Sequence, residues 1–222
     1  RAFGVDAERV HVVSHGTYHA KSNPEITKAT AREALGLAQN LVVGLVFGFQ
    51  RPYKGTHTLL EALASAQLAK PMTVLIRGEA TDPAYREKLE GIIAANTSTL
   101  SVNAQFVSVP DSDVQTLFKA SDIVLLPYLE GSQSGIKYMA YAYGRPVLVS
   151  NIGSLAEFVQ PGTTGEIIEP NDTEDLVRAL NYMITNYSYY DESRIRDMAH
   201  DEFSFDSAVA AVDRVYLQLR ST

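Results

Sequence analysis

The chain contains no cysteine and no tryptophan among its 222 residues. Without cysteine it can form neither disulfides nor thiolate metal sites, which suits a cytoplasmic protein. No apolar stretch approaches the roughly 20 residues that a membrane-spanning helix needs. We therefore expect no transmembrane segment and a cytoplasmic location, which is compatible with peripheral attachment to the inner membrane face.

Basic residues are also scarce. The chain has 19 Lys and Arg against 26 Asp and Glu, which gives a formal net charge of −7, and the cations do not cluster. Because nucleic-acid binding rests on the neutralisation of phosphates by Lys and Arg, we expect no nucleic-acid partner. The chain begins with Arg1 rather than Met, and we expect it to be a fragment of a longer protein.

Strand-like runs alternate with helical patterns along almost the whole chain. The runs 41–47 and 123–126 are apolar without alternation, as in strands covered on both faces. This order predicts an α/β fold with a doubly wound, Rossmann-like parallel sheet and a ligand at the carboxyl ends of the strands. The predicted strands are 10–14, 41–48, 72–77, 103–109, 122–127, 146–150 and 165–168. The predicted helices are 26–36, 56–69, 83–95, 112–119, 134–143, 154–159, 172–186, 189–201 and 206–219.

One domain over residues 1–222 is an ordinary size for this class, and the sequence shows no linker or internal repeat. The segment 203–222 is predicted to form a C-terminal helix. It places Val209, Val212, Tyr216 and Leu219 on one apolar stripe, so we expect this helix to pack against another surface.

A turn rich in serine and glycine separates the apolar run 123–126 from the predicted helix 134–143. Helix N-termini leave amides unpaired and carry partial positive charge, so a phosphate fits there. Ser132 or Ser134 could instead simply cap the helix. Glu130, the one acid of this turn, is either a solvated carboxylate or an acceptor for a ligand hydroxyl.

The second notable loop is Phe49-Gln50-Arg51-Pro52-Tyr53-Lys54-Gly55, which follows the strand predicted at 41–48. It puts two cations where the fold predicts the ligand. A diphosphate requires such charges, with arginine providing a fork and lysine a point charge. Loops of this kind also carry cations for solubility alone. One amide-rich and one cationic loop in the same domain favour anion binding more than either does alone.

Three histidines, His11, His15 and His19, recur every four residues, a spacing that would align metal ligands on a helix. The local sequence predicts a strand and a turn instead, and no carboxylate is placed to complete a site, so we expect no metal. His15 could still approach a ligand from its loop. We interpret His57 and His200 as ordinary helix residues.

The motifs together have a recognisable order. They are Gly48, Arg51-Pro52-Tyr53-Lys54-Gly55, the run from Ser121 to Pro127, Ser134-Gly135, the run from Ala142 to Val147, the run from Gly153 to Glu157, and the run from Gly162 to Gly165. This order resembles the donor-binding half of GT-B glycosyltransferases, and more narrowly the group 1, or family 4, retaining enzymes. The resemblance extends from about residue 12 to the closing helix.

The resemblance implies metal-independent transfer, with retention, from a UDP-, GDP- or ADP-sugar, as in polysaccharide biosynthesis, and no cofactor. It also implies a missing N-terminal domain that holds a glycan or lipid-linked acceptor and receives the C-terminal helix, so the isolated chain is expected to be inactive. Lys54 matches the family's diphosphate-binding lysine. The family's arginine falls at Phe49, and Arg51 is its substitute. The expected catalytic residues are Arg51, Lys54 and Glu130.

The family usually has two glutamates in its second loop, and these positions align with Gly131 and Met139 here. A branch of the family carries a Ser-Gly turn instead, and residues 132–136 are similar to that branch. Besides Arg51 and Lys54, the residues expected at the diphosphate are Gly131, Ser132, Gln133, Ser134, Gly135 and Ile136. The residues expected at the nucleoside are Gly78, Phe106, Val107 and Val109. His15 and Gly16, in the place of the family's linker loop, are expected near the donor.

Two other functions stay open. A nucleotide-sugar epimerase or a phosphorylase shares this architecture, although an epimerase needs acid–base groups beside the sugar and none is evident. A non-catalytic GT-B-like binding module is favoured by Met139 at the glutamate position. Arg51 and Lys54 beside an intact Ser-Gly turn argue against such a module.

Overall fold

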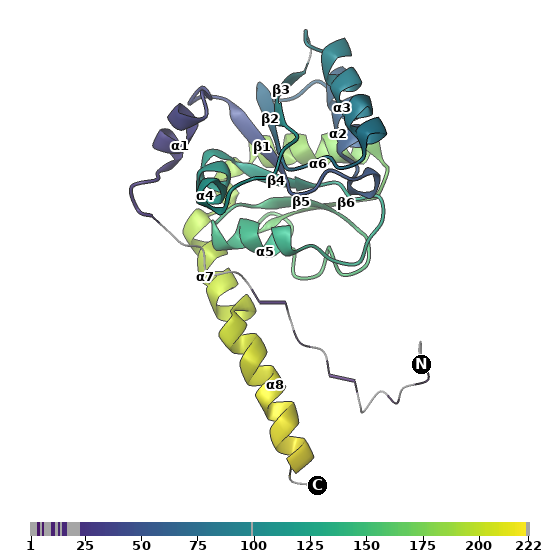
Figure 1. The fold of residues 1–222 in the computed structure, drawn as a ribbon. Coiled ribbons are helices and arrows are strands. Elements are labelled where there is room, and N and C mark those ends of the chain that lie inside the picture. Colours follow the sequence, from purple (N-terminus) through teal and green to yellow (C-terminus); the bar gives the residue numbers. More distant parts are fainter. Residues whose placement is uncertain are drawn as a thin grey trace.

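The computed structural model describes residues 4, 6, 10, 11, 13, 15, 16, 23–98 and 100–220. A parallel sheet lies at its centre, with helices on both faces (Figure 1). The strands are β1 (Val42–Phe47), β2 (Met72–Arg77), β3 (Ser101–Gln105), β4 (Ile123–Leu126), β5 (Val147–Ser150) and β6 (Gly165–Ile168). The helices are α1 (Lys28–Ala34), α2 (Thr56–Ser65), α3 (Pro83–Ala95), α4 (Asp111–Ala120), α5 (Gly135–Ala142), α6 (Thr173–Thr185), α7 (Glu192–Phe203) and α8 (Phe205–Arg220), and the short helical turns are η2 (Pro52–Lys54) and η3 (Tyr187–Tyr189).

The strand order is β3-β2-β1-β4-β5-β6, and all neighbouring strands are parallel. The doubly wound α/β prediction is therefore confirmed. From β1 the chain adds β2 and β3 on one side, and it then crosses to the other side of β1 to add β4, β5 and β6. At this reversal point Gly44 of β1 pairs with Val74 on one side and with Ile123 on the other. In such sheets ligands bind in the crevice beyond the carboxyl ends of the strands at the reversal point. The loops after β1 and β4 are the two that carry the predicted site.

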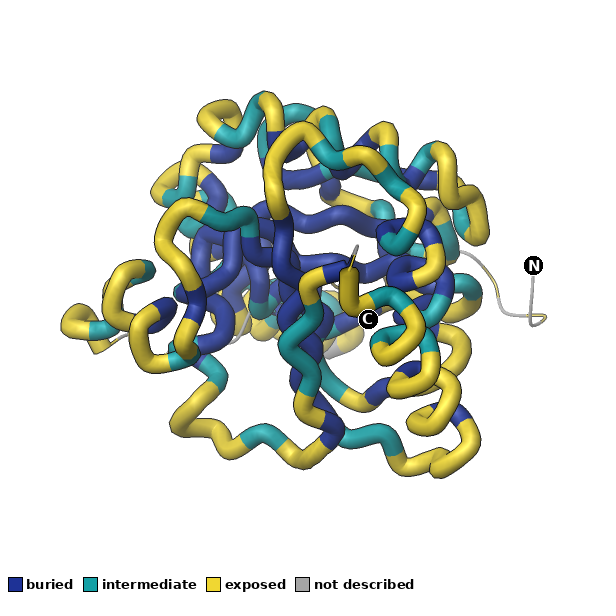
Figure 2. Tube along the Cα trace, turned by 90° about the horizontal axis from the view of Figure 1, so that it is seen from above, coloured by how far each residue is buried: buried dark blue, intermediate teal, exposed yellow. Residues whose placement is uncertain are grey.

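The core lies along the strands, and the exposed residues lie mainly on the surrounding helices and loops (Figure 2). Every residue of β2, β4 and β5 is buried, as expected for strands covered on both faces. Close packing also explains Gly44 in β1. A Cβ there would lie 2.2 Å from Met72 Cε and 2.7 Å from Leu125 Cδ1.

Short polar side chains set the beginnings of several helices. Asp82 accepts a hydrogen bond from the Ala84 amide at 3.0 Å before α3, and Pro83 follows it at the first helical position. Asp172 accepts one from the Asp175 amide at 2.9 Å before α6. These contacts pair amides that have no partner inside the helix, which explains why the predicted and observed starts agree closely.

A buried charge cluster joins α1 to the entry of the sheet. The Asp122 carboxylate accepts a hydrogen bond from the Arg32 guanidinium at 2.6 Å and one from the Val43 amide at 2.7 Å, and it also pairs with Lys28. Arg32 Nε donates to the Ala120 carbonyl at 2.9 Å. Asp122 therefore holds α1, the start of β1 and the start of β4 in one arrangement.

Some predicted elements were wrong. The segment predicted as a helix at 154–159 forms a series of turns and bends, in which the carbonyls of Ser154, Leu155 and Glu157 accept hydrogen bonds from the buried ammonium of Lys137. The strand predicted at 103–109 ends at residue 105, and the helix predicted at 56–69 ends at residue 65. In the strand predicted at 10–14, residues 12 and 14 lie outside the described residues, and 10, 11 and 13 belong to no strand.

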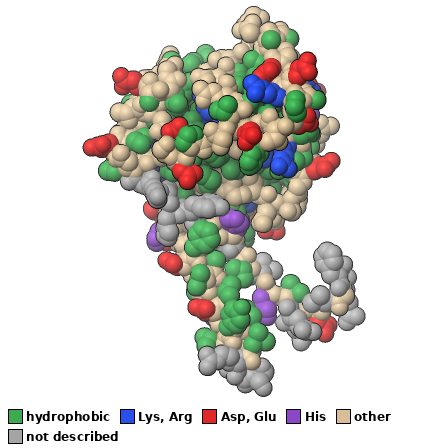
Figure 3. Space-filling view, viewed as in Figure 1, with side chains coloured by type: hydrophobic (Ala, Val, Ile, Leu, Met, Phe, Trp, Pro, Cys, Tyr) green, Lys and Arg blue, Asp and Glu red, His purple; other side chains and the backbone are tan. Residues whose placement is uncertain are grey.

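Helix α8 projects away from the body of the domain (Figure 1), and hydrophobic side chains cover much of its visible surface (Figure 3). The exposed fractions of Val209 and Tyr216 are 56% and 65%. The apolar stripe is thus present as predicted, and its packing against a further domain stays a prediction. None of the described helices is both long and apolar enough to cross a membrane.

Candidate functional site

A buried glutamine fixes the loop that follows β1. The Gln50 side chain is fully buried, and its amide group donates to the Gly48 carbonyl at 2.7 Å. Its side-chain oxygen accepts a hydrogen bond from the Thr56 hydroxyl at 2.8 Å, and its backbone amide donates to the Glu79 carbonyl at 2.8 Å. These hydrogen bonds hold the beginning of the loop, at Gly48, close to its end, at Thr56. The backbone between them carries the two predicted cations.

The loop after β1 also packs directly on the loop after β4. Gly55 has a φ of +68°, and a Cβ there would lie 1.9 Å from the Pro127 carbonyl oxygen. Only glycine combines this conformation with so close an approach. The Leu129 amide donates to the Tyr53 carbonyl at 2.7 Å. The cationic and the Ser-Gly loops therefore form one unit.

The Lys54 ammonium lies inside this unit. The residue is 8% exposed, and within the described part of the chain no hydrogen bond or ion pair is found for its nitrogen. A Cβ on Gly48 would lie 3.3 Å from Lys54 Nζ and 3.7 Å from Ile136 Cδ1, so these groups converge. Burial, and then the charge of Arg51, lowers the pKa of Lys54 to about 8. An ammonium that is largely dehydrated and lacks a counter-charge favours the approach of an anion.

Helix α5 begins beside this lysine. The Ser134 side chain accepts a hydrogen bond from the Ile136 amide at 3.3 Å, so Ser134 does cap the helix. Its hydroxyl also shares a hydrogen bond of 3.0 Å with the hydroxyl of Tyr128. Lys54 Nζ lies 5.7 Å from the centre of the same tyrosine ring. Tyr128 therefore contacts both the cation and the cap, and burial raises its pKa to about 12, which keeps the hydroxyl protonated.

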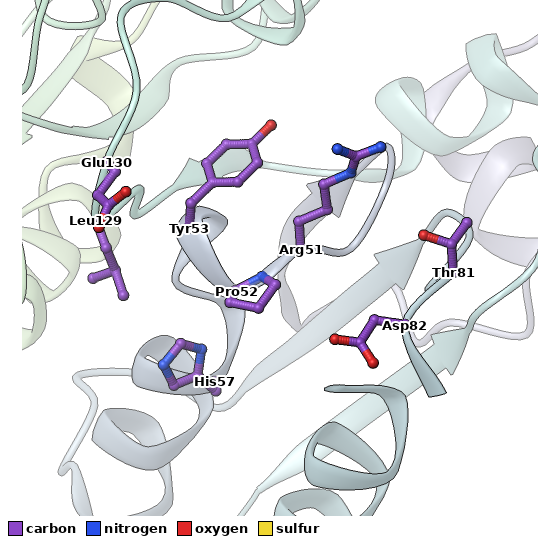
Figure 4. A pocket seen from close by; sticks show the side chains of 8 residues that line it. All are labelled: Arg51, Pro52, Tyr53, His57, Thr81, Asp82, Leu129 and Glu130. Atoms are coloured by element: carbon purple, nitrogen blue, oxygen red, sulfur yellow. The ribbon is translucent and has the colours of Figure 1, made fainter. Parts of the chain in front are cut away.

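A cavity of about 650 Å³ opens beside this unit (Figure 4). It gathers residues from the loops after β1, β2 and β4: Arg51, Pro52, Tyr53, His57, Thr81, Asp82, Leu129 and Glu130. Arg51 and Glu130 are exposed, so their charged ends are open to a ligand. The interpretation of His57 as an ordinary helix residue was incomplete. It lies in the first turn of α2, its Nδ1 lies 3.1 Å from the Tyr85 hydroxyl, and it lines this cavity.

A second cavity, of about 520 Å³, lies at the carboxyl ends of β2 and β3. Val107, Val109 and Asp113 line it, together with Arg77. Arg77 is 5% exposed and donates to the carbonyl and side-chain oxygens of Asn103 at 2.7 and 2.9 Å. Burial lowers the pKa of this guanidinium. The cavity combines apolar walls with a few polar groups, as small-molecule sites do.

Residues 40–186 match the family profile of the glycosyl transferases group 1. The chain belongs to this family. It is 28% identical over 189 residues to the D-inositol 3-phosphate glycosyltransferase of Rhodococcus erythropolis, covering 82% of this chain and 42% of that protein. It is 27% identical over 224 residues to the enzyme of the same name from Streptomyces scabiei, covering 97% of this chain and 50% of that protein. The chain spans about half the length of these curated relatives.

Solved structures show the same GT-B type of fold. A glycosyltransferase from Rickettsia africae has a TM-score of 0.80 at 21% identity, covering 97% of this chain and 59% of that one. Anabaena HepE in complex with UDP and glucose has a TM-score of 0.77 at 25% identity, covering 99% and 59%. The C-terminal domain of a group 1 protein from Francisella tularensis has a TM-score of 0.67 at 19% identity, covering 91% and 100%.

The fold brings together three of the eight residues predicted at the diphosphate. Lys54, Ser134 and Ile136 surround one point beyond the ends of β1 and β4. Arg51 and Glu130 line the adjoining cavity. The rest of the predicted turn, Gly131, Ser132 and Gln133, is exposed, and Gly135 opens α5. Their contacts with a donor stay a prediction.

Two of the four residues predicted at the nucleoside line the second cavity, and the other two lie elsewhere. Val107 and Val109 line the second cavity, whereas Phe106 is 8% exposed and lies below the Arg86 guanidinium at 5.9 Å. Gly78 has a φ of +140°, and a Cβ there would lie 2.1 Å from the Gly48 carbonyl oxygen. The chain's own packing therefore explains this glycine without a ligand.

His15 and Gly16 of the predicted linker loop lie against α5 and α8. The His15 ring stacks on the Tyr138 ring with centres 5.0 Å apart, and a Cβ on Gly16 would lie 2.5 Å from the Phe205 ring. Neither residue lines the two cavities described above. No group of three His, Asp or Glu side chains within the described ranges could hold a metal ion, and His19 falls outside those ranges.

Sequence reasoning missed Tyr128 and Gln50. Tyr128 follows Pro127 directly beyond a buried strand, a position that can be recognised from the sequence. The role of Gln50 depends on contacts with Gly48, Thr56 and Glu79, and no local sequence pattern predicts these contacts.

Proposed function

We propose that this chain is the C-terminal donor-binding domain of a retaining glycosyltransferase and that it binds a nucleoside diphosphate sugar. The Lys54 ammonium carries this proposal. It is 8% exposed, no ion pair within the described residues balances it, and it lies beside the beginning of α5. A diphosphate can accept hydrogen bonds from the ammonium and from first-turn amides at the same time.

The chemistry follows from where charge develops. When the bond between the sugar carbon and the diphosphate oxygen breaks, negative charge grows on the leaving nucleoside diphosphate. Lys54, Arg51 and the first turn of α5 present positive charge that is already in place, and such preorganised groups stabilise a developing anion strongly. The protein's own groups supply this charge, so we propose that transfer proceeds without a metal ion.

The adjoining groups have distinct proposed roles. Glu130, which lines the 650 Å³ cavity, accepts hydrogen bonds from sugar hydroxyls, and Gln133 assists it from the exposed turn. The nucleoside occupies the 520 Å³ cavity lined by Val107 and Val109. Because HepE was solved with UDP, we favour uridine among the three bases considered.

The acceptor and the other catalytic groups belong to the proposed N-terminal domain. The chain spans about half the length of its curated relatives, and the exposed Val209 and Tyr216 of α8 offer an apolar surface for a second domain. We propose a glycan or a lipid-linked sugar as the acceptor. The isolated chain then binds donor without transferring it.

The test is calorimetric titration of the chain with UDP, GDP and ADP in the absence of metal. One nucleotide is expected to bind with a Kd between about 10 μM and 1 mM, and Lys54→Ala is expected to weaken it about tenfold or more. Lys88→Ala is the matched control, because the Lys88 side chain is 47% exposed and lies on α3. Equal affinity of wild type and Lys54→Ala contradicts the assignment.

A non-catalytic binding module is the second candidate. Its support is Met139, which packs against the core at the position where the family usually has its second glutamate. A product assay on a longer protein that includes the acceptor half distinguishes the two candidate functions. A transferase forms a glycoside whose anomeric configuration, measured by proton NMR coupling, equals that of the donor. A binding module forms no product at any nucleotide-sugar concentration.

A further inference from the structure

Lys137 is a fully buried lysine on α5 that has no ion-pair partner within the described residues. Its ammonium donates to three backbone carbonyls, those of Ser154 at 3.3 Å, Leu155 at 2.9 Å and Glu157 at 2.7 Å. Burial lowers the pKa of this lysine to about 8. Burying an ammonium is unfavourable unless its hydrogens are fully used, and here all three have an acceptor.

The carbonyls belong to the loop 151–158, which follows β5 and rests on the Ser-Gly turn. The Ser154 amide and hydroxyl both donate to the Ser132 carbonyl, at 2.6 and 2.8 Å. Gly153 has a φ of +47°, and a Cβ there would lie 2.7 Å from Ser132 Cα. The backbone of this loop is therefore in direct contact with the turn that precedes α5.

The same loop contains a strained residue. Phe158 has a φ of +63°, a conformation that bulky side chains rarely adopt, and the residue is 48% exposed. A backbone strained in this way persists only where surrounding contacts determine it. The adjoining Glu157 carbonyl accepts the shortest of the three Lys137 hydrogen bonds. Lys137 is thus a principal anchor of a loop that local preference alone does not stabilise.

These contacts form a closed ring that begins and ends on α5. Lys137 donates hydrogen bonds to the loop 151–158, and Ser154 of that loop donates one to Ser132. The chain continues from Ser132 to Ser134, which caps α5. We propose that Lys137 is a positioning residue for the donor site, which acts through this loop to fix the amides at the beginning of α5. Its effect on donor affinity rests on the proposed function, whereas its effect on the loop does not.

A purely structural role predicts a different result. If Lys137 only contributed to stability, its loss would loosen the whole domain in proportion to the stability lost. If it positions the turn, two particular amides should lose protection first. These are the Ser154 amide, bonded to the Ser132 carbonyl, and the Ile136 amide, bonded to the Ser134 hydroxyl.

The experiment compares two variants with a control in native-state hydrogen exchange and in UDP titration. Lys137→Met removes the three hydrogen bonds and keeps an unbranched apolar side chain in place. Ser154→Ala removes only the hydroxyl contact and remains informative if Lys137→Met fails to fold. The control is Tyr141→Phe, on the same helix. It removes a buried hydrogen bond of 3.3 Å to Thr164 and leaves the hydrogen bonds of the loop 151–158 unchanged.

For Lys137→Met, we expect exchange of the Ser154 and Ile136 amides to accelerate about tenfold relative to the amides of β2, and UDP affinity to fall about tenfold. Ser154→Ala should show smaller changes in the same direction, and Tyr141→Phe should change neither quantity selectively. Uniform acceleration across the domain overturns the proposal, and so does selective acceleration with unchanged UDP affinity. If the wild-type chain binds none of UDP, GDP and ADP, the proposed function fails, and the exchange data alone decide whether Lys137 holds the turn; if it binds GDP or ADP instead of UDP, that nucleotide replaces UDP in the titrations.

Discussion

The hydroxyl groups of Tyr128 and Ser134 lie 3.0 Å apart in a buried hydrogen bond that links the end of β4 to the beginning of α5. The same tyrosine ring lies beside the Lys54 ammonium at 5.7 Å. One side chain thus sets the separation between a cation and a helix N-terminus, the two groups expected to share a diphosphate. The relationship is testable because the hydroxyl and the ring can be changed separately.

Tyr128→Phe keeps the ring beside Lys54 and removes the hydrogen bond to Ser134. We expect the free energy of unfolding to fall by about 1 kcal/mol, the typical contribution of one buried hydrogen bond. UDP affinity should fall roughly three- to tenfold, because the cap of α5 loses one of its two contacts. Thermal unfolding and calorimetry measure the two effects. Tyr182→Phe, on the surface of α6 with an exposed fraction of 41%, should alter neither, and an unchanged affinity in Tyr128→Phe contradicts the relationship.

Donor binding should depend on pH through Lys54. Its pKa is lowered to about 8, so the ammonium that binds phosphate is present below this pH and is lost as the pH rises through it. UDP affinity is expected to fall about twofold between pH 7 and 8 and more steeply above pH 8, approaching tenfold per pH unit. Calorimetric titrations between pH 7 and 9.5 measure this.

Lys137, whose pKa is also lowered to about 8, could produce a similar profile. Lys54→Arg distinguishes the two lysines, because arginine stays charged over the whole range. We expect the fall in affinity above pH 8 to become much shallower in Lys54→Arg, with any remaining slope due to Lys137. A profile that falls as steeply as in the wild type assigns the titration elsewhere.

Gly55→Ala should destabilise the domain strongly. The added Cβ would lie 1.9 Å from the Pro127 carbonyl oxygen, at a φ of +68° that alanine does not favour. We expect a loss of about 2–4 kcal/mol in the free energy of unfolding, measured with urea. Gly91→Ala is the matched control, because Gly91 lies in α3 with nothing within 4 Å of an added Cβ. That change should stabilise by about 0.5–1 kcal/mol, and similar effects at both sites contradict the packing argument.

Asp122→Ala should leave Arg32 as an unpaired buried charge. Arg32 has a side-chain exposure of 2%, and removal of one partner from a buried ion pair typically destabilises by about 3–5 kcal/mol. Glu61→Ala breaks an exposed pair of 3.8 Å with Lys88 and should change stability by less than about 0.5 kcal/mol. Urea unfolding checks both, and a loss below about 1 kcal/mol in Asp122→Ala refutes the role assigned to the cluster.

The strand and helix order could be predicted because it depends on local patterns. The uninterrupted apolar runs of β1 and β4 show burial on both faces, and Asp172 marks the beginning of α6. The loop after β5 was predicted wrongly as a helix. Leu155, Ala156 and Val159 have helical spacing, but the loop's conformation depends on hydrogen bonds to Lys137, which no local pattern reveals.

The site could be predicted to a similar extent. Lys54 and the beginning of α5 were recognisable, because a cation and a Ser-Gly turn each follow an apolar run. Their convergence depends on two contacts. Gly55 approaches Pro127, which lies more than 70 residues away in the sequence. Tyr128 contacts Ser134 on the other side of the Ser-Gly turn. At Gly78, which was expected at the nucleoside, the absence of a Cβ makes room for the Gly48 carbonyl, a contact that no local pattern reveals.

The central claim is that a diphosphate binds between Lys54 and the first turn of α5. The most direct measurement is a titration of the isotope-labelled chain with UDP, followed by proton–nitrogen NMR. We predict that the largest shifts occur at the amides of Ser134, Gly135 and Ile136 and at the Lys54 ammonium, and that Lys54→Ala abolishes the amide shifts. Shifts confined to other parts of the sheet edge, or amide shifts that persist in Lys54→Ala, would contradict the account.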